Sequence, residues 1–77
     1  MLKVTVYSTP TCPWCSKTKE FLKENNVQYH EINVAADHKA AQDMIEKSGQ
    51  MGVPVTDIEG TIIVGFDKNA LKRALKL

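Results

Sequence analysis

Two cysteines, in the run Cys12-Pro13-Trp14-Cys15, are the residues of this sequence best suited to chemistry. If the run opens a helix, the two thiols lie at the ends of its first turn, within the range that a disulfide can bridge. Such a bridge encloses so little chain that it hardly restricts the unfolded state, which is the usual way in which a disulfide stabilises a protein. A disulfide that forms and breaks during a reaction is the better interpretation, and we expect redox chemistry.

The two cysteines are expected to have different roles. If Cys12 is the helix N-cap and Pro13 the first helical residue, the proline loses no needed N–H and its fixed φ suits a helix start. The free N–H groups of Trp14 and Cys15, and the positive end of the helix dipole, then favour the thiolate of Cys12. Since the thiolate is the attacking species, we expect Cys12 to attack a disulfide and Cys15 to resolve the mixed disulfide.

Zinc binding is the second chemistry to consider, because Cys12, Cys15, His30 and His38 are residue types that bind zinc. Seven residues separate the two histidines, against roughly three to five in zinc fingers. The histidines also fall on different predicted elements, a strand and a helix. The sequence therefore disfavours a structural zinc site, and we expect no bound metal.

The elements that must position the cysteines follow from the spacing of apolar residues. Residues 1–7 alternate, with Leu2, Val4 and Val6 on one face, and predict a strand that ends at a turn over residues 8–10. Residues 13–25 predict a helix, in which Lys17, Lys19, Lys23 and Glu24 face water. The positions with helical spacing that we expect to be buried are Cys15, Thr18, Phe21 and Leu22.

A second strand and helix follow. Residues 27–34 return to an extended pattern, and Asp37 and Gly49 are the expected cap and stop of the next helix. The apolar stripe of that helix is expected to contain Ala36, Ala40, Ala41, Met44 and Ile45. A strand–helix–strand order of this length implies a right-handed crossover between parallel strands.

The second half of the sequence predicts a hairpin and a last helix. Residues 55–58 and 61–64 are β-branched runs joined by Glu59-Gly60, the length of a tight hairpin loop. Asp67 is expected to cap a helix that packs on the sheet through Leu71, Ala74 and Leu75. The resulting order, βαβαββα, predicts an α/β fold with a four-stranded mixed sheet and helices on both faces.

Length and composition exclude several classes of protein. The 77 residues predict a single domain over residues 1–77, and 43% hydrophobic with 25% charged residues is ordinary for a globular protein. A net charge of +1, with acids and bases interleaved, gives no reason to expect nucleic acid or a membrane as partner. The sequence has neither a secretory signal nor a membrane-spanning run, and a single CxxC suits a reducing compartment, so we expect a cytoplasmic monomer.

Over nearly its whole length the sequence resembles the glutaredoxin family of the thioredoxin superfamily. The motifs that carry the resemblance are Cys12-Pro13-Trp14-Cys15, Gly52-Val53-Pro54 and Gly65-Phe66-Asp67. Trp14 stands where the family usually has a tyrosine. The resemblance implies a thioredoxin-like fold and a thiol–disulfide oxidoreductase that reduces disulfides of client proteins or glutathione mixed disulfides, without a bound prosthetic group.

The resemblance also implies a substrate groove beside the cysteines. In the family, the proline at the position of Pro54 is cis and faces the disulfide, which leaves the backbone of Val53 to pair with an extended substrate. The family segment that matches Gly65-Phe66-Asp67 holds the γ-glutamyl end of glutathione, where N–H groups at a helix start bind a carboxylate and Asp67 is placed to accept the ammonium. Besides the two cysteines, the implied site residues are Pro13, Trp14, Val53, Pro54, Gly65, Phe66 and Asp67.

The sequence departs from the family pattern in ways that leave the electron donor open. Thr9 stands where a glutathione-binding lysine is frequent, Gly52 replaces a threonine, and Val64 replaces the first glycine of a Gly-Gly pair. Gly65-Phe66 resembles NrdH-type redoxins, which take electrons from thioredoxin reductase, although Asp67-Lys68 replaces their Arg-Pro. Glutathione and a thioredoxin-reductase-type flavoprotein are therefore both candidate donors. A module that binds a metal or an iron–sulfur cluster through Cys12 and Cys15 is a further alternative, which Pro13 disfavours.

Overall fold

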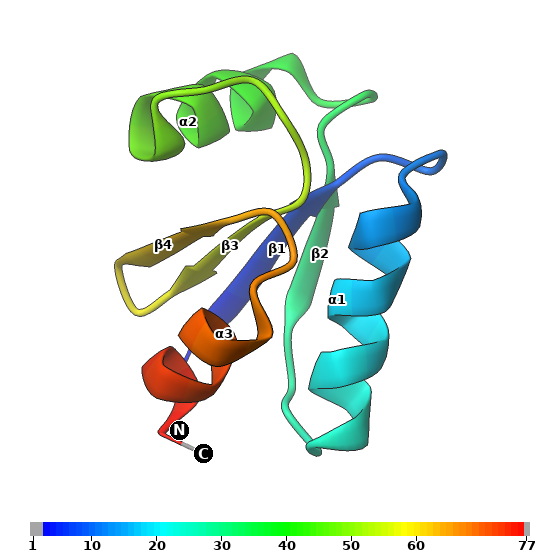
Figure 1. Ribbon diagram of the computed structural model, residues 1–77. Coiled ribbons are helices and arrows are strands. Elements are labelled where there is room, and N and C mark those ends of the chain that lie inside the picture. The colour runs from blue at the N-terminus through cyan, green and yellow to red at the C-terminus, as the bar shows by residue number, and fades with distance from the viewer. Residues whose placement is uncertain (1–2, 77) are drawn as a thin grey trace.

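A computed structural model describes residues 3–76, and it contains a four-stranded mixed sheet with helices on both faces (Figure 1). In chain order the elements are β1 (Val4–Ser8), α1 (Pro13–Glu24), β2 (His30–Asn33), α2 (His38–Ser48), β3 (Val55–Ile58), β4 (Thr61–Val64) and α3 (Lys68–Leu75). The strand order is β2-β1-β3-β4, with β1 and β2 parallel and the other pairs antiparallel. The predicted fold class and element order are confirmed, whereas the prediction for Leu2 lies outside the described residues.

Each helix begins at a residue whose side chain accepts a hydrogen bond from a backbone N–H three residues later. Cys12 accepts from Cys15 at 3.1 Å, Asp37 from Ala40 at 3.0 Å, and Asp67 from Ala70 at 3.1 Å. These caps confirm the predicted helix starts. The prediction that Ala36 belongs to the apolar stripe of the second helix is wrong, because α2 begins only after the Asp37 cap and Ala36 is exposed.

Two hydrophobic clusters, one on each face of the sheet, hold the layers together. Successive side chains of β1 point to opposite faces, so Val6 lies in the cluster under α1 and α3 while Tyr7 lies in the cluster under α2. The first cluster contains Val4, Val6, Phe21, Leu22, Ile58, Ile63, Leu71 and Leu75. The second contains Tyr7, Ala40, Met44 and Val55.

The central position of β1 matters for the site. Because β1 is covered on both faces and paired on both edges, it forms a rigid base for the turn that follows Ser8 and carries the cysteines. In Figure 1, β1 leads through this turn directly into α1. Within residues 3–76, no helix has the length and apolar character needed to cross a membrane.

Candidate active site

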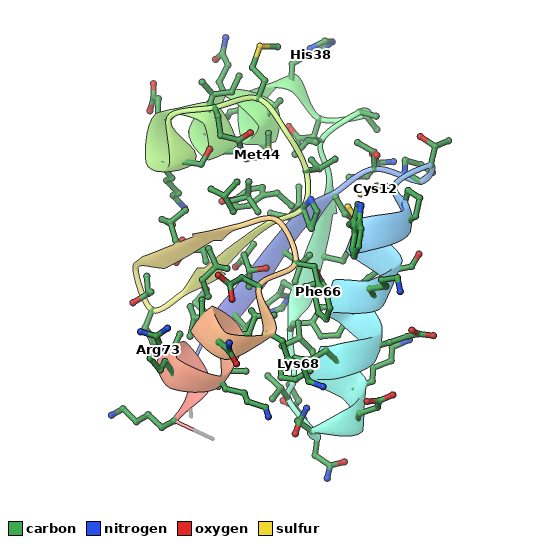
Figure 2. The ribbon with its side chains drawn as sticks, viewed as in Figure 1. Cys12, His38, Met44, Phe66, Lys68 and Arg73 are labelled. Carbon is green, nitrogen blue, oxygen red and sulfur yellow. The ribbon has the colours of Figure 1, made fainter. Side chains whose placement is uncertain are left out.

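Cys12 is the N-cap of α1, where Figure 2 shows it at the start of the helix. Its backbone is extended, with φ −94° and ψ 110°, and Pro13 takes the first helical position as predicted. The Cys12 sulfur accepts a hydrogen bond from the Cys15 N–H at 3.1 Å. The sequence predicted that the N–H groups of Trp14 and Cys15 would both point at this sulfur, and the hydrogen bond comes from Cys15. The sulfur thus lies at the start of the helix, in contact with one of its first free N–H groups.

Cys15 lies one turn inside α1 and is 1% exposed. Burial, followed by the hydrogen bond to Cys12, raises the pKa of the Cys15 thiol to about 11. Both cysteines are free thiols in the structure. Cys15 is therefore a protonated, shielded thiol at neutral pH, whereas Cys12 is partly exposed to an incoming molecule.

The peptide bond between Val53 and Pro54 is cis, as the family resemblance implied. The Cys12 thiol donates a hydrogen bond to the Val53 carbonyl oxygen, with 3.7 Å between sulfur and oxygen. The segment before β3 is thereby placed against the start of α1, although 41 positions separate the two residues in the chain. The backbone of Val53 lies next to the reactive sulfur.

A shallow groove of about 270 Å³ runs beside the cysteines and is lined by Trp14, Val53, Pro54, Gly65 and Phe66. Trp14 is 55% exposed and stacks on Phe66, with 6.3 Å between ring centroids and 23° between ring planes. Figure 2 shows Phe66 in the connection between β4 and α3. The fold thus gathers five of the predicted substrate-contacting residues, whereas Pro13 and Asp67 are not part of the groove lining.

Gly65 joins the two sides of the groove. Its φ of +76° is a left-handed conformation that favours glycine, and its N–H donates to the Pro54 carbonyl at 2.8 Å. The Asp67 carboxylate is engaged with Ala70 at the start of α3. The Gly65 N–H is therefore used within the protein, so the N–H groups expected for ligand carboxylates must come from later residues of this segment.

Gln50 is a site residue that the sequence analysis missed. Its amide nitrogen donates to the Gly52 carbonyl at 3.0 Å, and its amide oxygen accepts from the Gly52 N–H at 2.6 Å. A side chain at position 52 would place its Cβ 2.7 Å from that amide oxygen. The glycine before Val53 therefore makes room for the amide group that braces this loop.

Lys19 was expected to face water, and the structure shows a partly exposed side chain that also forms an ion pair with β2. Its ammonium lies 2.7 Å from the Glu31 carboxylate, and its side chain is 26% exposed. The same Glu31 oxygen accepts a hydrogen bond from Ser8 at 2.9 Å. The hydrogen bond between the two raises the pKa of Lys19 and lowers the pKa of Glu31, so the pair is charged at neutral pH.

The four candidate zinc ligands do not come together. His30 and His38 are exposed, and Figure 2 shows His38 at the start of α2, apart from Cys12. Across residues 3–76, no three His, Cys, Asp or Glu side chains form a group that could hold a metal ion.

A larger hollow of about 930 Å³ lies between the amino end of β2 and the carboxyl ends of α1 and α3, and neither cysteine lines it.

Comparisons with known proteins agree with this geometry. The family model for glutaredoxin matches residues 4–63. A glutaredoxin-like 8.6 kDa protein from the rubredoxin operon of Clostridium pasteurianum is 49% identical over 73 residues, which cover 95% of this chain and 97% of that protein. Glutaredoxin 3 of Escherichia coli is 31% identical over 67 residues, covering 87% and 81% of the two chains.

A solved structure, that of the thioredoxin-like protein BC3987, superposes with a TM-score of 0.87 at 36% identity, covering 94% of this chain and 99% of that one. The family match spans the cysteine pair, Val53 and Pro54 of the groove, and most of the sheet. The chain belongs to the glutaredoxin family.

Proposed function

We propose that this protein reduces disulfides of client proteins by dithiol exchange, with Cys12 as the attacking thiol and Cys15 as the resolving thiol. The observation that supports this most directly is the unequal pair at the start of α1. The Cys12 sulfur is partly exposed and accepts a hydrogen bond from a backbone N–H, while Cys15 is buried and its thiol has a raised pKa. Such a pair separates attack from resolution.

The reaction balances without a metal or prosthetic group. The Cys12 thiolate attacks one sulfur of the substrate disulfide, a mixed disulfide forms, and the other substrate sulfur leaves as a thiolate. Cys15 then loses its proton and attacks Cys12, the bond between Cys12 and the substrate breaks, and the departing thiolate takes up the proton. Two protein thiols are oxidised and one substrate disulfide is reduced to two thiols.

The Val53 carbonyl oxygen can bind a substrate N–H, and its availability depends on the protonation state of Cys12. While Cys12 is protonated, its thiol donates to that carbonyl. When Cys12 ionises, the donor is lost and the carbonyl becomes available to an N–H of an extended substrate backbone. The apolar rings of Trp14 and Phe66 then contact side chains next to the substrate cysteine.

Two serine variants test the assignment. Cys12→Ser should abolish reduction of insulin disulfides, because the attacking sulfur is gone. Cys15→Ser should keep the first step and accumulate a mixed disulfide with the substrate, which intact-mass spectrometry detects. Insulin reduction by Cys12→Ser at the wild-type rate, or a stable adduct on Cys15 in that variant, would contradict the proposal.

A thioredoxin-reductase-type flavoprotein is the electron donor that the groove favours over glutathione. Glutathione carries two carboxylates, but the groove lining consists of apolar side chains and glycine. Thr9 and Gly52 offer no cation at the positions considered above, and the Gly52 backbone is engaged by Gln50. Without a cation at positions 9 and 52, glutathione loses charge-assisted hydrogen bonds there, which are the stronger kind.

An NADPH-coupled assay distinguishes the two donors. The oxidised protein is supplied once with glutathione and glutathione reductase, and once with thioredoxin reductase. We expect the second system to consume NADPH faster. Faster turnover with glutathione would instead assign the protein to the glutathione-dependent glutaredoxins and leave the roles of Cys12 and Cys15 unchanged.

A further inference from the structure

The second step of the proposed reaction requires a negative charge on a buried sulfur. Cys15 is 1% exposed, and a thiolate in such a position is disfavoured because it loses its hydration. The residue must nevertheless ionise to attack Cys12. A positive charge close to Cys15 would offset this cost.

Lys19 lies one turn beyond Cys15 on α1. Residues four apart on a helix are neighbours on the same face, and this face of α1 points towards the sheet. The Lys19 side chain reaches β2, where its ammonium lies 2.7 Å from Glu31. This ion pair fixes the position of the ammonium, whereas a lysine without a partner samples many rotamers.

Glu31 is itself fixed in place from a second side. Ser8, the last residue of β1, is 1% exposed and donates its hydroxyl to the same Glu31 oxygen at 2.9 Å. The parallel pairing of β1 with β2 sets this geometry, since Ser8 is paired with Asn33 and Val6 with Glu31. A chain of contacts thus runs from Ser8 at the end of β1 through Glu31 to Lys19, one turn beyond Cys15 on α1.

We propose that Lys19 is a positioning residue for the resolving step, held by Glu31 and Ser8 so that its positive charge stabilises the Cys15 thiolate. This inference rests on the proposed dithiol reaction and deepens it. Nothing in the reaction requires Lys19 to touch the substrate or to exchange a proton. Its contribution is electrostatic and is confined to the second of the two steps.

The balance of charges around Cys15 supports this division between steps. Burial is the largest effect that raises the pKa of Cys15, and the hydrogen bond and charge of Cys12 raise it further. A backbone hydrogen bond at Thr9 and the charge of Lys19 lower it. Once Cys12 is in a mixed disulfide, its negative charge is gone, and Lys19 is then the charged side chain that acts on Cys15.

Two ionisable groups near Lys19 raise the pKa of its ammonium. Glu31 and Tyr29, from the β2 side, both raise the pKa of Lys19. The ammonium is therefore charged at neutral pH, where the two steps are compared. At neutral pH the rate of the resolving step therefore reports on the Cys15 thiol and not on loss of the lysine charge.

Stopped-flow reaction with dithiobis(nitrobenzoate) separates the two steps, because attack by Cys12 and resolution by Cys15 each release one coloured thiolate. In Lys19→Met the first phase should keep its wild-type rate. At neutral pH the second phase should slow by about threefold for each unit by which the pKa of Cys15 rises. A higher pKa lowers the thiolate fraction tenfold per unit, but the remaining thiolate is a better nucleophile, which offsets part of this loss. Its rate profile should shift to higher pH.

Two further variants control for the loss of a lysine and for folding. Lys19→Arg keeps the charge and should restore the second phase. Lys23→Met removes an exposed lysine from the last turn of the same helix and should leave both phases unchanged. An unshifted second-phase profile in Lys19→Met, failure of Lys19→Arg to restore it, or equal slowing in Lys23→Met would overturn the inference. If wild-type protein released only one thiolate, the dithiol reaction itself would be wrong.

Discussion

Cys12 and Cys15 are the same residue type three positions apart, yet the protein places them in opposite environments. Cys12 precedes the first turn of α1, where N–H groups lack partners within the helix. Cys15 has turned inward against the sheet and is buried. This difference in burial is the physical basis on which we propose that the two thiols act in successive steps.

The raised pKa of Cys15 has a consequence for stability. The folded state binds the thiol proton more tightly than the unfolded state, for which 9.0 is the reference and about 11 the folded value. Stability from the neutral thiol is thus fully present below about pH 9 and is lost as pH rises towards about pH 11. In urea unfolding of the reduced protein, the free energy of unfolding should fall over this range by on the order of 2 kcal/mol.

Cys15→Ser provides the comparison for that experiment, because lysines and tyrosines also titrate over the same range in both proteins. The difference in unfolding free energy between wild type and variant should shrink as pH rises. Parallel curves for the two proteins would show that Cys15 keeps its ordinary pKa, contrary to the structure.

Single residues of the site differ in how far the sequence could predict them. The roles of Cys12 and Asp37 as caps depend on neighbours three positions away, so local patterns were sufficient. The contacts of Lys19 and Gln50 could not be predicted, for different reasons. The contact of Lys19 with Glu31 requires the register of β1 with β2, and the fold of Gln50 over Gly52 requires a loop conformation that no periodic pattern encodes.

At the scale of elements, the start of α3 contributes both to the stability of the fold and to the position of the groove. This helix has only eight residues, Lys68–Leu75, and its cap Asp67 directly follows Phe66 of the groove. Phe66 also packs edge-on against Phe21 of α1, with ring centroids 6.3 Å apart. The start of α3 therefore sets the position of one wall of the groove.

Substitution of Asp67 separates its role as a cap from the ligand-binding role that the family resemblance implies. Asp67→Ala should lower the free energy of unfolding by about 1 kcal/mol, because the Ala70 N–H loses its side-chain partner. Asp67→Asn keeps a capping oxygen and should retain stability, while it raises KM for any substrate whose ammonium binds the carboxylate. Urea unfolding and steady-state kinetics measure the two effects. Equal destabilisation by Ala and Asn would contradict the capping role.

The extents of the elements were predictable where local sequence decides them. The hairpin strands at 55–58 and 61–64 agree with the prediction because the Glu59-Gly60 turn fixes both inner ends. The second strand was expected over residues 27–34, but β2 covers only His30–Asn33. Its length is limited by its partner, since pairing with β1 runs only from Thr5 to Ser8.

For the whole molecule, the two faces of the sheet are protected unequally. One face is covered by α1 and α3 and the other by α2 alone (Figure 1). Lys47 ties α2 to the sheet by hydrogen bonds of 3.0 Å to both Tyr7 and Asp57. After α2, the chain turns at Gly49 and runs through Gln50 to the cis Val53–Pro54 bond, so the seating of α2 also positions the groove.

Met44 is the largest side chain that α2 buries, at 2% exposure, and it packs in the cluster with Tyr7 and Val55. Met44→Ala should lower the free energy of unfolding by about 2–4 kcal/mol, since it removes buried apolar area and leaves a cavity under a helix with few other anchors. That loss is a large share of the stability of so small a domain. Met44→Leu, which nearly conserves volume, should cost less than about 1.5 kcal/mol. Urea unfolding at neutral pH measures both, and an alanine variant as stable as the leucine variant would mean that α2 is held mainly by Lys47 rather than by its apolar face.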